Sequence, residues 1–427
     1  MRLGGRLAAA IEILEDIETR HRPAADAMRD WGLSHRFAGA GDRAAIGNFV
    51  YDALRRRRAA SWIFDADTPR TLVLGGYLLE SGALPEELGR LIADDRFAPS
   101  VLTEAELAAL QARLSEELPA PARANAPEWC EPLMEEAFGA AWVDEGAALA
   151  SRPPLDMRVN RLKASREKVL ASLARAGAKP ARIAPSGLRI APISGDGRHP
   201  NIQAEPAFQK GWFEVQDEGS QIVAELAGPA QGSQVLDFCA GAGGKTLAFS
   251  AMMDNRGQIY AFDADKQRLA PIFDRLKRAG CRNVQVIADE RQLTRLEGQM
   301  DLVVVDAPCT GSGTWRRRPD AKWRLTAQQL EARRAEQATI LDAASRYVKP
   351  GGRLAYITCS IFQEENAEQA SAFLARSPQF SAADYGALWR ERFNSAAAEP
   401  RIGNGITLTP ATTGTDGFYF ACFGRAA

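Results

Sequence analysis

The chain has 427 residues, of which 46% are hydrophobic and 25% are charged, as is typical of a soluble globular protein with two or three domains. No apolar run approaches the ~20 residues that span a bilayer, and the N-terminus lacks the apolar core of a signal peptide. The six cysteines form no CxxC pair, which argues against a disulfide framework or a zinc site. We therefore expect a cytoplasmic protein that uses neither a membrane nor a metal.

Charge is distributed unevenly along the chain, although the net charge is −1. Residues 1–150 carry −9, from 16 arginines against 25 acidic residues, whereas residues 151–220 carry +5 and residues 221–427 carry +3. A basic excess in the middle and C-terminal parts is expected where a protein touches a polyanion. It does not by itself identify nucleic acid as the ligand.

Residues 1–150 are predicted to be helical throughout. One helix begins at Asp42, a residue type favoured at the N-cap, and it places apolar side chains such as Phe49 on one face. It ends on four arginines, 55–58, which suit a helix C-terminus and are equally compatible with an RNA contact. No residue pattern here indicates catalysis, so a helical interaction domain is expected.

Residues 151–230 are predicted to form a small basic α+β domain. A proline- and alanine-rich loop, residues 119–127, marks the end of the helical region. Residues 155–160 alternate as a strand does, residues 165–176 form a helical pattern, and short strands follow near 188–191 and 213–215. The domain is suited to binding RNA, and a purely structural packing role is the alternative.

Residues 231–427 alternate between strand and helix patterns, which predicts an α/β domain with a doubly wound, mostly parallel sheet. The predicted strands are 235–238, 258–262, 284–288, 302–305 and 354–357, and the predicted helices are 245–253, 266–279 and 327–348. Residues 417–423 are predicted to be a final strand, paired with 406–408.

A glycine-rich loop follows the first of these strands, in the segment Asp237–Thr246. A phosphate-binding P-loop is excluded because Cys239 stands where the motif needs glycine, and the dinucleotide pattern is excluded because Thr246 replaces its third glycine. Asp263, 20 residues beyond Gly243, ends the next strand and can accept the hydroxyls of a ribose. This layout suits S-adenosylmethionine, which has no phosphates; a tight turn that merely requires glycine is compatible with it too.

Two thiols follow the ends of two strands. Asp306-Ala-Pro-Cys309 comes after the strand 302–305, and Thr358-Cys359-Ser360 comes after the strand 354–357. The carboxyl ends of parallel strands form the edge where α/β proteins bind ligands. Methylation of a pyrimidine at carbon 5 needs a thiolate that adds to carbon 6, an acid near ring nitrogen 3, and a group that helps to remove the carbon-5 proton. Asp306, Cys309 and Cys359 supply this set, and a buried small hydrophobe is the alternative for each cysteine.

These motifs resemble the Sun/RsmB-like family of RNA cytosine-5 methyltransferases. Residues 158–160 resemble the RNA-binding extension of the family, and residues 1–150 resemble more loosely its NusB-like helical domain. The resemblance covers residues 150–427 closely, and its motifs are Asp237–Thr246, Asp306–Thr314, Arg318–Arg324, Thr358–Ser360 followed by Glu364–Asn366, and Asp416–Tyr419. It implies a Rossmann-like class I methyltransferase domain preceded by a NusB-like domain and the small RNA-binding domain.

The resemblance also implies roles for individual residues. Cys359 would be the nucleophile and Cys309 would assist proton removal and release, an assignment that spacing alone leaves open. Asp306 would contact the cytosine, with Lys245 nearby. The residues implied to hold S-adenosylmethionine are Cys239, Ala240, Gly241, Ala242, Gly243, Gly244, Lys245, Asp263, Asp289 and Asp306. The stretch 240–242 departs from the family, which usually has a proline there.

A basic loop after the first thiol is predicted to bind RNA, because interleaved cations and an aromatic suit a single-stranded backbone and a stacked base. The predicted RNA-binding residues are Arg158, Asn160, Arg316, Arg317, Arg318, Lys322 and Arg324. The target base must be unpaired or extruded to reach two thiols. We expect a monomeric rRNA cytosine-5 methyltransferase, with a transfer-RNA methyltransferase or a non-catalytic RNA-binding assembly factor as alternatives.

Overall fold

The computed structural model describes residues 1–93, 95–195, 197–393 and 400–427. The chain divides into two compact units. The first contains residues 1–153, 192–199 and 315–325, and the second contains residues 154–191, 200–314 and 326–427. Each unit has its own hydrophobic core.

The first unit is helical, as the sequence predicts for residues 1–150. Its helices are α1 (Leu3–Arg20), α2 (Ala24–Ser34), α3 (Ala40–Arg55), α4 (Arg57–Phe64), α5 (Pro69–Ser81), α6 (Pro85–Ala93), α7 (Glu104–Leu114), α8 (Ala120–Ala124), α9 (Glu131–Phe138), α10 (Trp142–Leu149) and, from later in the chain, α17 (Pro319–Arg324). Residues 315–325 therefore belong with the helical unit, although the sequence places them in the predicted C-terminal domain.

Close packing of α5 against its neighbours depends on two glycines. A Cβ atom at Gly75 would lie 2.7 Å from the Cβ of Ala60 in α4, and one at Gly76 would lie 2.9 Å from the backbone nitrogen of Ala53 in α3. Both distances are too short for real atoms, so the helices can approach this closely only because α5 has no side chain there. Thr68 caps α5 by accepting from the backbone N–H of Thr71.

The second unit contains a small antiparallel sheet whose strand order is β2-β3-β1-β4. Its strands are β1 (Leu155–Val159), β2 (Lys179–Pro180), β3 (Gly187–Ile190) and β4 (Phe213–Val215), and the helix α11 (Arg166–Ser172) packs on them. Met157, Val169, Leu188 and Phe213 form the centre of its core. The strands predicted near 155–160, 188–191 and 213–215 are confirmed.

A larger sheet forms the rest of the second unit, with the order β11-β12-β13-β9-β8-β5-β6-β7 and β10 paired to β13. Strands β5 to β9 run parallel where they are neighbours, and β13 pairs antiparallel with β9. The strands are β5 (Gln234–Asp237), β6 (Gln258–Phe262), β7 (Val284–Ile287), β8 (Met300–Asp306), β9 (Val348–Thr358), β10 (Phe380–Ala382), β11 (Arg401–Gly403), β12 (Gly405–Leu408) and β13 (Phe418–Arg425). The predicted mostly parallel sheet and its final antiparallel strand are confirmed.

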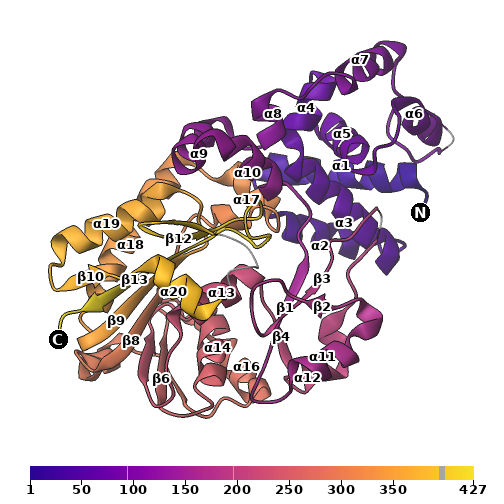
Figure 1. Cartoon of the computed structure of the whole chain (residues 1–427). Coiled ribbons are helices and arrows are strands. Elements are labelled where there is room, and N and C mark those ends of the chain that lie inside the picture. The colour runs from indigo at the N-terminus through magenta and orange to yellow at the C-terminus, as the bar shows by residue number, and fades with distance from the viewer. Residues whose placement is uncertain (94, 196, 394–399) are drawn as a thin grey trace. The chain divides into compact units, whose positions relative to one another are not determined.

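Helices cover both faces of this sheet, as Figure 1 shows. On one face lie α13 (Glu218–Ala227), α14 (Gly244–Met252) and α16 (Ile272–Ala279), and on the other lie α18 (Ala327–Ser345) and α19 (Ala367–Arg376). Coverage on both sides explains why the middle of β8 is uninterrupted apolar sequence. The chain reverses its direction of travel across the sheet between β5 and β8, which is where doubly wound sheets open a ligand crevice.

Two predicted helices are wrong in detail: the one predicted to begin at Asp42 begins at Ala40, with Gly39 as its N-cap, and the one predicted over residues 266–279 is interrupted. It is split into α15 (Lys266–Leu269) and α16 because Pro271 stands between them and has no N–H to continue the helical bonding.

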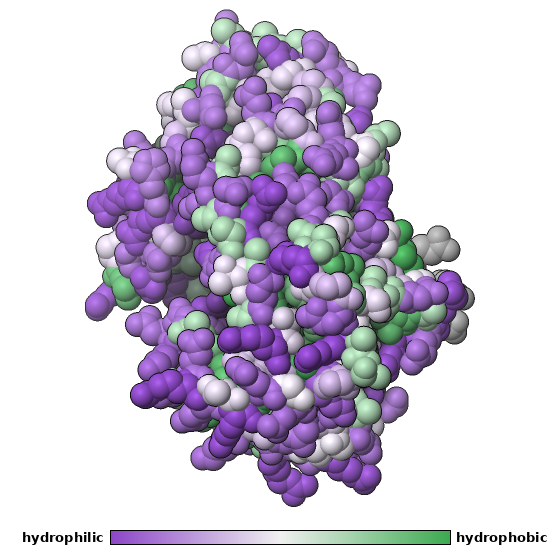
Figure 2. Space-filling view, turned by 90° about the vertical axis from the view of Figure 1, so that its left-hand side faces the viewer, coloured by the Kyte–Doolittle hydropathy of each residue, from purple (hydrophilic) through white to green (hydrophobic). Residues whose placement is uncertain are grey.

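On the face drawn in Figure 2, hydrophilic residues predominate and apolar ones are scattered among them. In the described part of the chain, no helix is long and apolar enough to cross a bilayer.

Candidate active site

The two cysteine-bearing loops leave the same edge of the large sheet. β8 and β9 are parallel neighbours, and Asp306 at the end of β8 is opposite Ile357 of β9. Cys309 comes three residues after the end of β8 and Cys359 directly follows β9, and Cys309 Sγ lies 3.3 Å from Cys359 Sγ. Both side chains are half-buried. The structure therefore brings together the two thiols that the sequence placed at separate strand ends.

The environment of Cys309 favours its protonated form. The neighbouring Cys359, as a hydrogen-bond partner, raises the pKa of the Cys309 thiol well above its ordinary value, and burial and the Glu365 carboxylate act in the same direction. A thiol with such a pKa keeps its proton at neutral pH and can donate it in a hydrogen bond to Cys359. Once deprotonated, the same sulfur is a strong base.

Lys245 and Asp306 form an ion pair beside the thiols. Lys245 follows the glycine loop, at the start of α14, and its Nζ lies 2.6 Å from Asp306 Oδ2. The Lys245 side chain is 5% exposed and that of Asp306 is 35% exposed, so the carboxylate is the accessible partner. The ring centre of Phe418 lies 5.6 Å from Lys245 Nζ. The pair ties the end of β8 to the start of α14.

The glycine loop and Asp263 also come together. Gly241 and Gly243 have φ angles of +49° and +82°, a left-handed conformation that favours glycine, and a Cβ at Gly243 would lie 2.5 Å from Cγ1 of Ile272. The backbone N–H of Gly241 donates to Asp263 Oδ2 at 2.8 Å. A loop of backbone next to a strand-end carboxylate can hold the ribose of a nucleoside.

Asp237, the last residue of β5, is a buried carboxyl beneath the glycine loop. Thr246 Oγ1 donates to its Oδ2 at 2.6 Å, and burial raises the pKa of Asp237 to about 7. Its protonation state therefore changes near neutral pH. Sequence reasoning used Asp237 only to place the loop, and its position at a strand end was the available signal.

Asp289 lies after β7 and is engaged by a neighbour. The backbone and side chain of Arg291 donate to it, and this lowers the pKa of Asp289 to about 2. The predicted contact of Asp289 with S-adenosylmethionine stays a prediction.

Family models for known proteins match most of the second unit. One described as 16S rRNA methyltransferase RsmB/F matches residues 224–424, and one described as the ferredoxin-like domain of RsmF/B-like methyltransferases matches residues 126–193. "Ribosomal RNA small subunit methyltransferase B" of Citrobacter koseri is 33% identical over 315 residues, which are 73% of this chain and 69% of that protein. The chain belongs to the RsmB/F family.

Two further likenesses agree with this membership. The protein of the same name from Photorhabdus laumondii is 34% identical over 300 residues, and the match spans 69% of this chain but only 65% of that protein. The solved structure of a methyltransferase homolog protein from Pyrococcus horikoshii is 25% identical, with a TM-score of 0.59, and covers 72% of this chain and 97% of that chain.

The RsmB/F-type basic loop does not form one open surface. Lys322 is 2% exposed and its Nζ donates to the carbonyl of Asn125, while Arg316 is 3% exposed. Both lie inside the helical unit, because α17 packs on α3 there and Trp323 donates to the Leu54 carbonyl. Both side chains are packed inside this unit, and the prediction that they bind RNA stays a prediction. Arg318 and Arg324 are exposed and Arg317 is half-buried, and their RNA contacts stay predictions.

Arg158 and Asn160 are also turned inward. Each is 6% exposed; Asn160 donates to the carbonyls of Gly211 and Ala279, and Arg158 donates to that of Gly244 at 3.4 Å. Burial lowers the pKa of Arg158 to about 10. These contacts hold the small sheet against the glycine loop and α16, and the predicted RNA contact of both residues stays a prediction.

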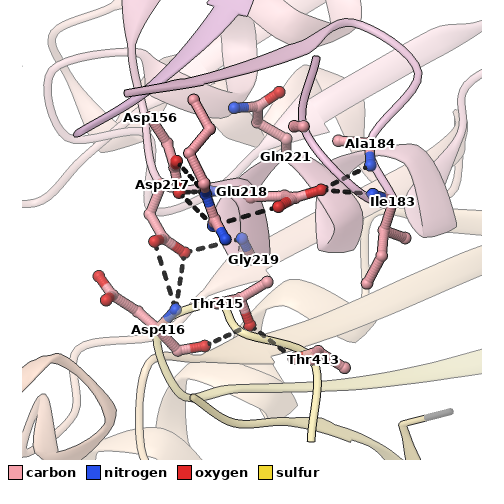
Figure 3. Close-up of polar contacts among 12 residues, drawn as sticks. Asp156, Ile183, Ala184, Asp217, Glu218, Gly219, Gln221, Thr413, Thr415 and Asp416 are labelled. Atoms are coloured by element: carbon pink, nitrogen blue, oxygen red, sulfur yellow. Dashed lines mark hydrogen bonds and ion pairs between the residues drawn. The ribbon is translucent and has the colours of Figure 1, made fainter. Parts of the chain in front are cut away.

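Sequence reasoning missed how the C-terminal motif 416–419 supports the site. The N–H of Gly417 donates to the Gly313 carbonyl at 2.8 Å, and the N–H of Gly313 donates to the Cys359 carbonyl at 2.9 Å. Figure 3 shows the other side of this motif: Asp217, the N-cap of α13, accepts from the N–H of Asp416 at 3.1 Å. A chain of bonds thus runs from α13 to the backbone of Cys359.

A buried acidic cluster anchors that cap. Asp156 accepts from the N–H of Glu218, and Glu218 accepts from the N–H groups of Ile183 and Ala184 (Figure 3). Arg189 balances both carboxylates, at 2.6 Å from Asp156 and 3.1 Å from Glu218. The start of α13 is therefore fixed to the small sheet.

Proposed function

We propose that the protein transfers a methyl group from S-adenosylmethionine to carbon 5 of a cytosine in small-subunit ribosomal RNA. The observation that carries the proposal is the approach of Cys309 Sγ and Cys359 Sγ to 3.3 Å. Carbon-5 chemistry needs a nucleophilic thiol and a second group that assists proton removal, and the two thiols can supply both, whereas methylation of an amino group needs no thiol. The RNA class is supported by the family description and by the printed names of the relatives.

In the proposed reaction the Cys359 thiolate adds to carbon 6 of the cytosine, and the electrons of the 5,6 double bond move to carbon 5. Asp306, which accepts a hydrogen bond from Lys245, faces the ring edge that carries nitrogen 3, where a proton donated through this pair neutralises the negative charge that the addition leaves on the ring. Carbon 5 then takes the methyl group, and the electron pair of the broken sulfur–methyl bond would stay on the donor sulfur, which leaves as a thioether. Cys309 assists removal of the carbon-5 proton, and the returning electrons break the carbon–sulfur bond and free Cys359.

The residues of the glycine loop fit the methyl donor. The backbone N–H of Gly241 donates to Asp263 Oδ2, so the loop lies beside a strand-end carboxylate of the kind that accepts from a ribose. Bound S-adenosylmethionine would supply an electrophilic methyl group on sulfur. The loop and Asp263 would hold its nucleoside.

Trapping of the protein–RNA adduct tests the proposal. Purified protein is incubated with small-subunit rRNA and S-adenosylmethionine, denatured, and analysed by gel, while bisulfite sequencing locates methylated cytosines. We expect Cys309→Ala to accumulate a denaturation-resistant adduct and Cys359→Ala to form none. Cys281→Ala, which alters a half-buried cysteine in the loop between α16 and β7, is the matched control and should behave like the unaltered protein.

Each other outcome has a distinct meaning. The reverse pattern would exchange the roles of the two cysteines. Methylation of transfer RNA but not of rRNA would replace the substrate, and RNA binding without any methylated cytosine would support an assembly factor instead.

A further inference from the structure

Glu365 is a fully buried carboxylate close to the thiols, and the reaction proposed above does not use it. It ends a short 3-10 turn, Gln363–Glu365, and its exposed fraction is 0%. A charge at such a position is tolerated only when its oxygens are hydrogen-bonded. Its partners therefore show what it holds.

Those partners are on both sides of Cys309. Thr310, the next residue, donates its N–H to Glu365 Oε1 at 2.8 Å and its hydroxyl to Oε2 at 2.6 Å. Gln337 of α18 donates to Glu365 Oε1 at 3.0 Å and also to the carbonyl of Pro308, the preceding residue, at 3.0 Å. Glu365 thus fixes both neighbours of Cys309: it holds Thr310 directly, and it holds Pro308 through the side-chain amide of Gln337.

The next residue, Asn366, holds Cys359 in the same way. The hydroxyl of Thr358 donates to Asn366 Oδ1 at 2.5 Å, and Asn366 Nδ2 donates to the Ser360 carbonyl at 2.9 Å. Asn366 is 2% exposed. Each cysteine is therefore flanked by two residues that one buried polar side chain restrains.

Adjacent residues in one turn set both restraints. The turn is itself fixed, since the hydroxyl of Tyr356 in β9 donates to the Glu365 carbonyl at 2.6 Å. A rigid anchor between the two loops accounts for the 3.3 Å separation of the sulfurs better than either loop alone, because neither cysteine is in regular structure.

We propose that Glu365 and Asn366 are positioning residues with separate tasks: Glu365 aims Cys309 for the release step, and Asn366 aims Cys359 for the attack. This inference rests on the proposed function, because it assigns a step to each thiol. Neither residue needs to touch the RNA or the methyl donor. Altering them should change rates and leave the KM values for both substrates within about 2-fold.

The test measures the two steps separately by adduct trapping. Attack is the initial rate of adduct formation in a Cys309→Ala background, and release is the fraction of protein held as adduct at steady state with Cys309 intact. Glu365→Gln keeps the size of the side chain and removes its charge, and Asn366→Ala removes both bonds to the Cys359 loop. Glu368→Gln, on an exposed glutamate three residues away in α19, is the matched control.

We expect Glu365→Gln to raise the trapped fraction about 10-fold and to leave attack unchanged, since a misplacement of a fraction of an ångström slows only the step that uses that group. Asn366→Ala should slow attack about 10-fold. Thr310→Val removes only the 2.6 Å bond from the Thr310 hydroxyl to Glu365, so it should raise the trapped fraction about 3-fold. This variant keeps the test usable if Glu365→Gln does not fold.

Equal slowing of both steps by Glu365→Gln and Asn366→Ala would overturn the separate tasks and leave a general packing role. Variants that all behave like Glu368→Gln would overturn the inference alone. No adduct in the Cys309→Ala reference itself would overturn the proposed function, and this inference with it.

Discussion

Two buried lysines, one in each unit, show how differently the same side chain can be used. Lys245 of the second unit and Lys322 of the first are 5% and 2% exposed. Lys245 Nζ faces the Asp306 carboxylate at 2.6 Å, whereas Lys322 Nζ donates to the carbonyl of Asn125 at 2.5 Å and lies 4.8 Å from the ring centre of Trp323.

Their electrostatic settings differ accordingly. Among the residues that the structure describes, Lys322 forms no ion pair with a carboxylate, and burial lowers its pKa to about 7. A lysine paired with a carboxylate at a strand end is a candidate for a role in a site, whereas Lys322, bonded to a carbonyl and close to aromatic rings, has a packing environment. Burial alone therefore does not mark a catalytic cation.

The largest effect should come from removing the cation at the site. Lys245→Met leaves the Asp306 carboxylate without its partner, and we expect methyl transfer to slow by about 10²–10³-fold because the charge beside the target base is lost. Single-turnover methylation of rRNA measures this. Lys277→Met, on an exposed lysine of α16, is the control, and an equal loss in both variants would remove the distinction between a site lysine and an ordinary one.

The next effect concerns stability and pH at Lys322. Its pKa is about 7 in the folded protein and 10.5 ordinarily, so the unfolded chain binds more protons between these values. The destabilisation by Lys322 is therefore complete below about pH 7 and is lost as pH rises toward 10.5. From pH 7 to 9 the unaltered protein should gain on the order of 2 kcal/mol relative to Lys322→Met, or a few degrees in Tm.

Thermal melting of the unaltered protein and of Lys322→Met at pH 6, 7, 8 and 9 checks this prediction. Activity at pH 7 should stay within about 2-fold in the variant, because the side chain is inside the helical unit. A difference in Tm that does not change with pH would mean that Lys322 is not the group that titrates.

The difference between Lys245 and Lys322 also shows what the sequence could and could not predict. Strand ends follow from local apolar runs, so the sheet, the glycine loop with Asp263, and the shared edge of Cys309 and Cys359 were predictable. The burial of Lys322 was not, because it depends on α17 packing against helices about 270 residues earlier in the chain. Glu365 was equally hidden, since its partners are brought to it by the fold.

The smallest effect should separate the two kinds of cation within the basic loop itself. Arg324 is 39% exposed on its side chain and pairs with Asp320 at 2.8 Å, so its removal should change Tm by less than about 1 °C, as for other surface ion pairs. If Arg324 contacts a phosphate as predicted, Arg324→Ala should weaken rRNA binding about 3-fold. The number of ions released on binding, obtained from the dependence of affinity on salt concentration, should fall by about one. Arg333→Ala is the matched control, since Arg333 is 44% exposed and pairs with Glu336. Filter binding from about 50 to 200 mM salt measures, for each variant, how steeply the affinity for rRNA falls as the salt concentration rises. An equal salt dependence for the two variants would contradict the predicted RNA contact of Arg324.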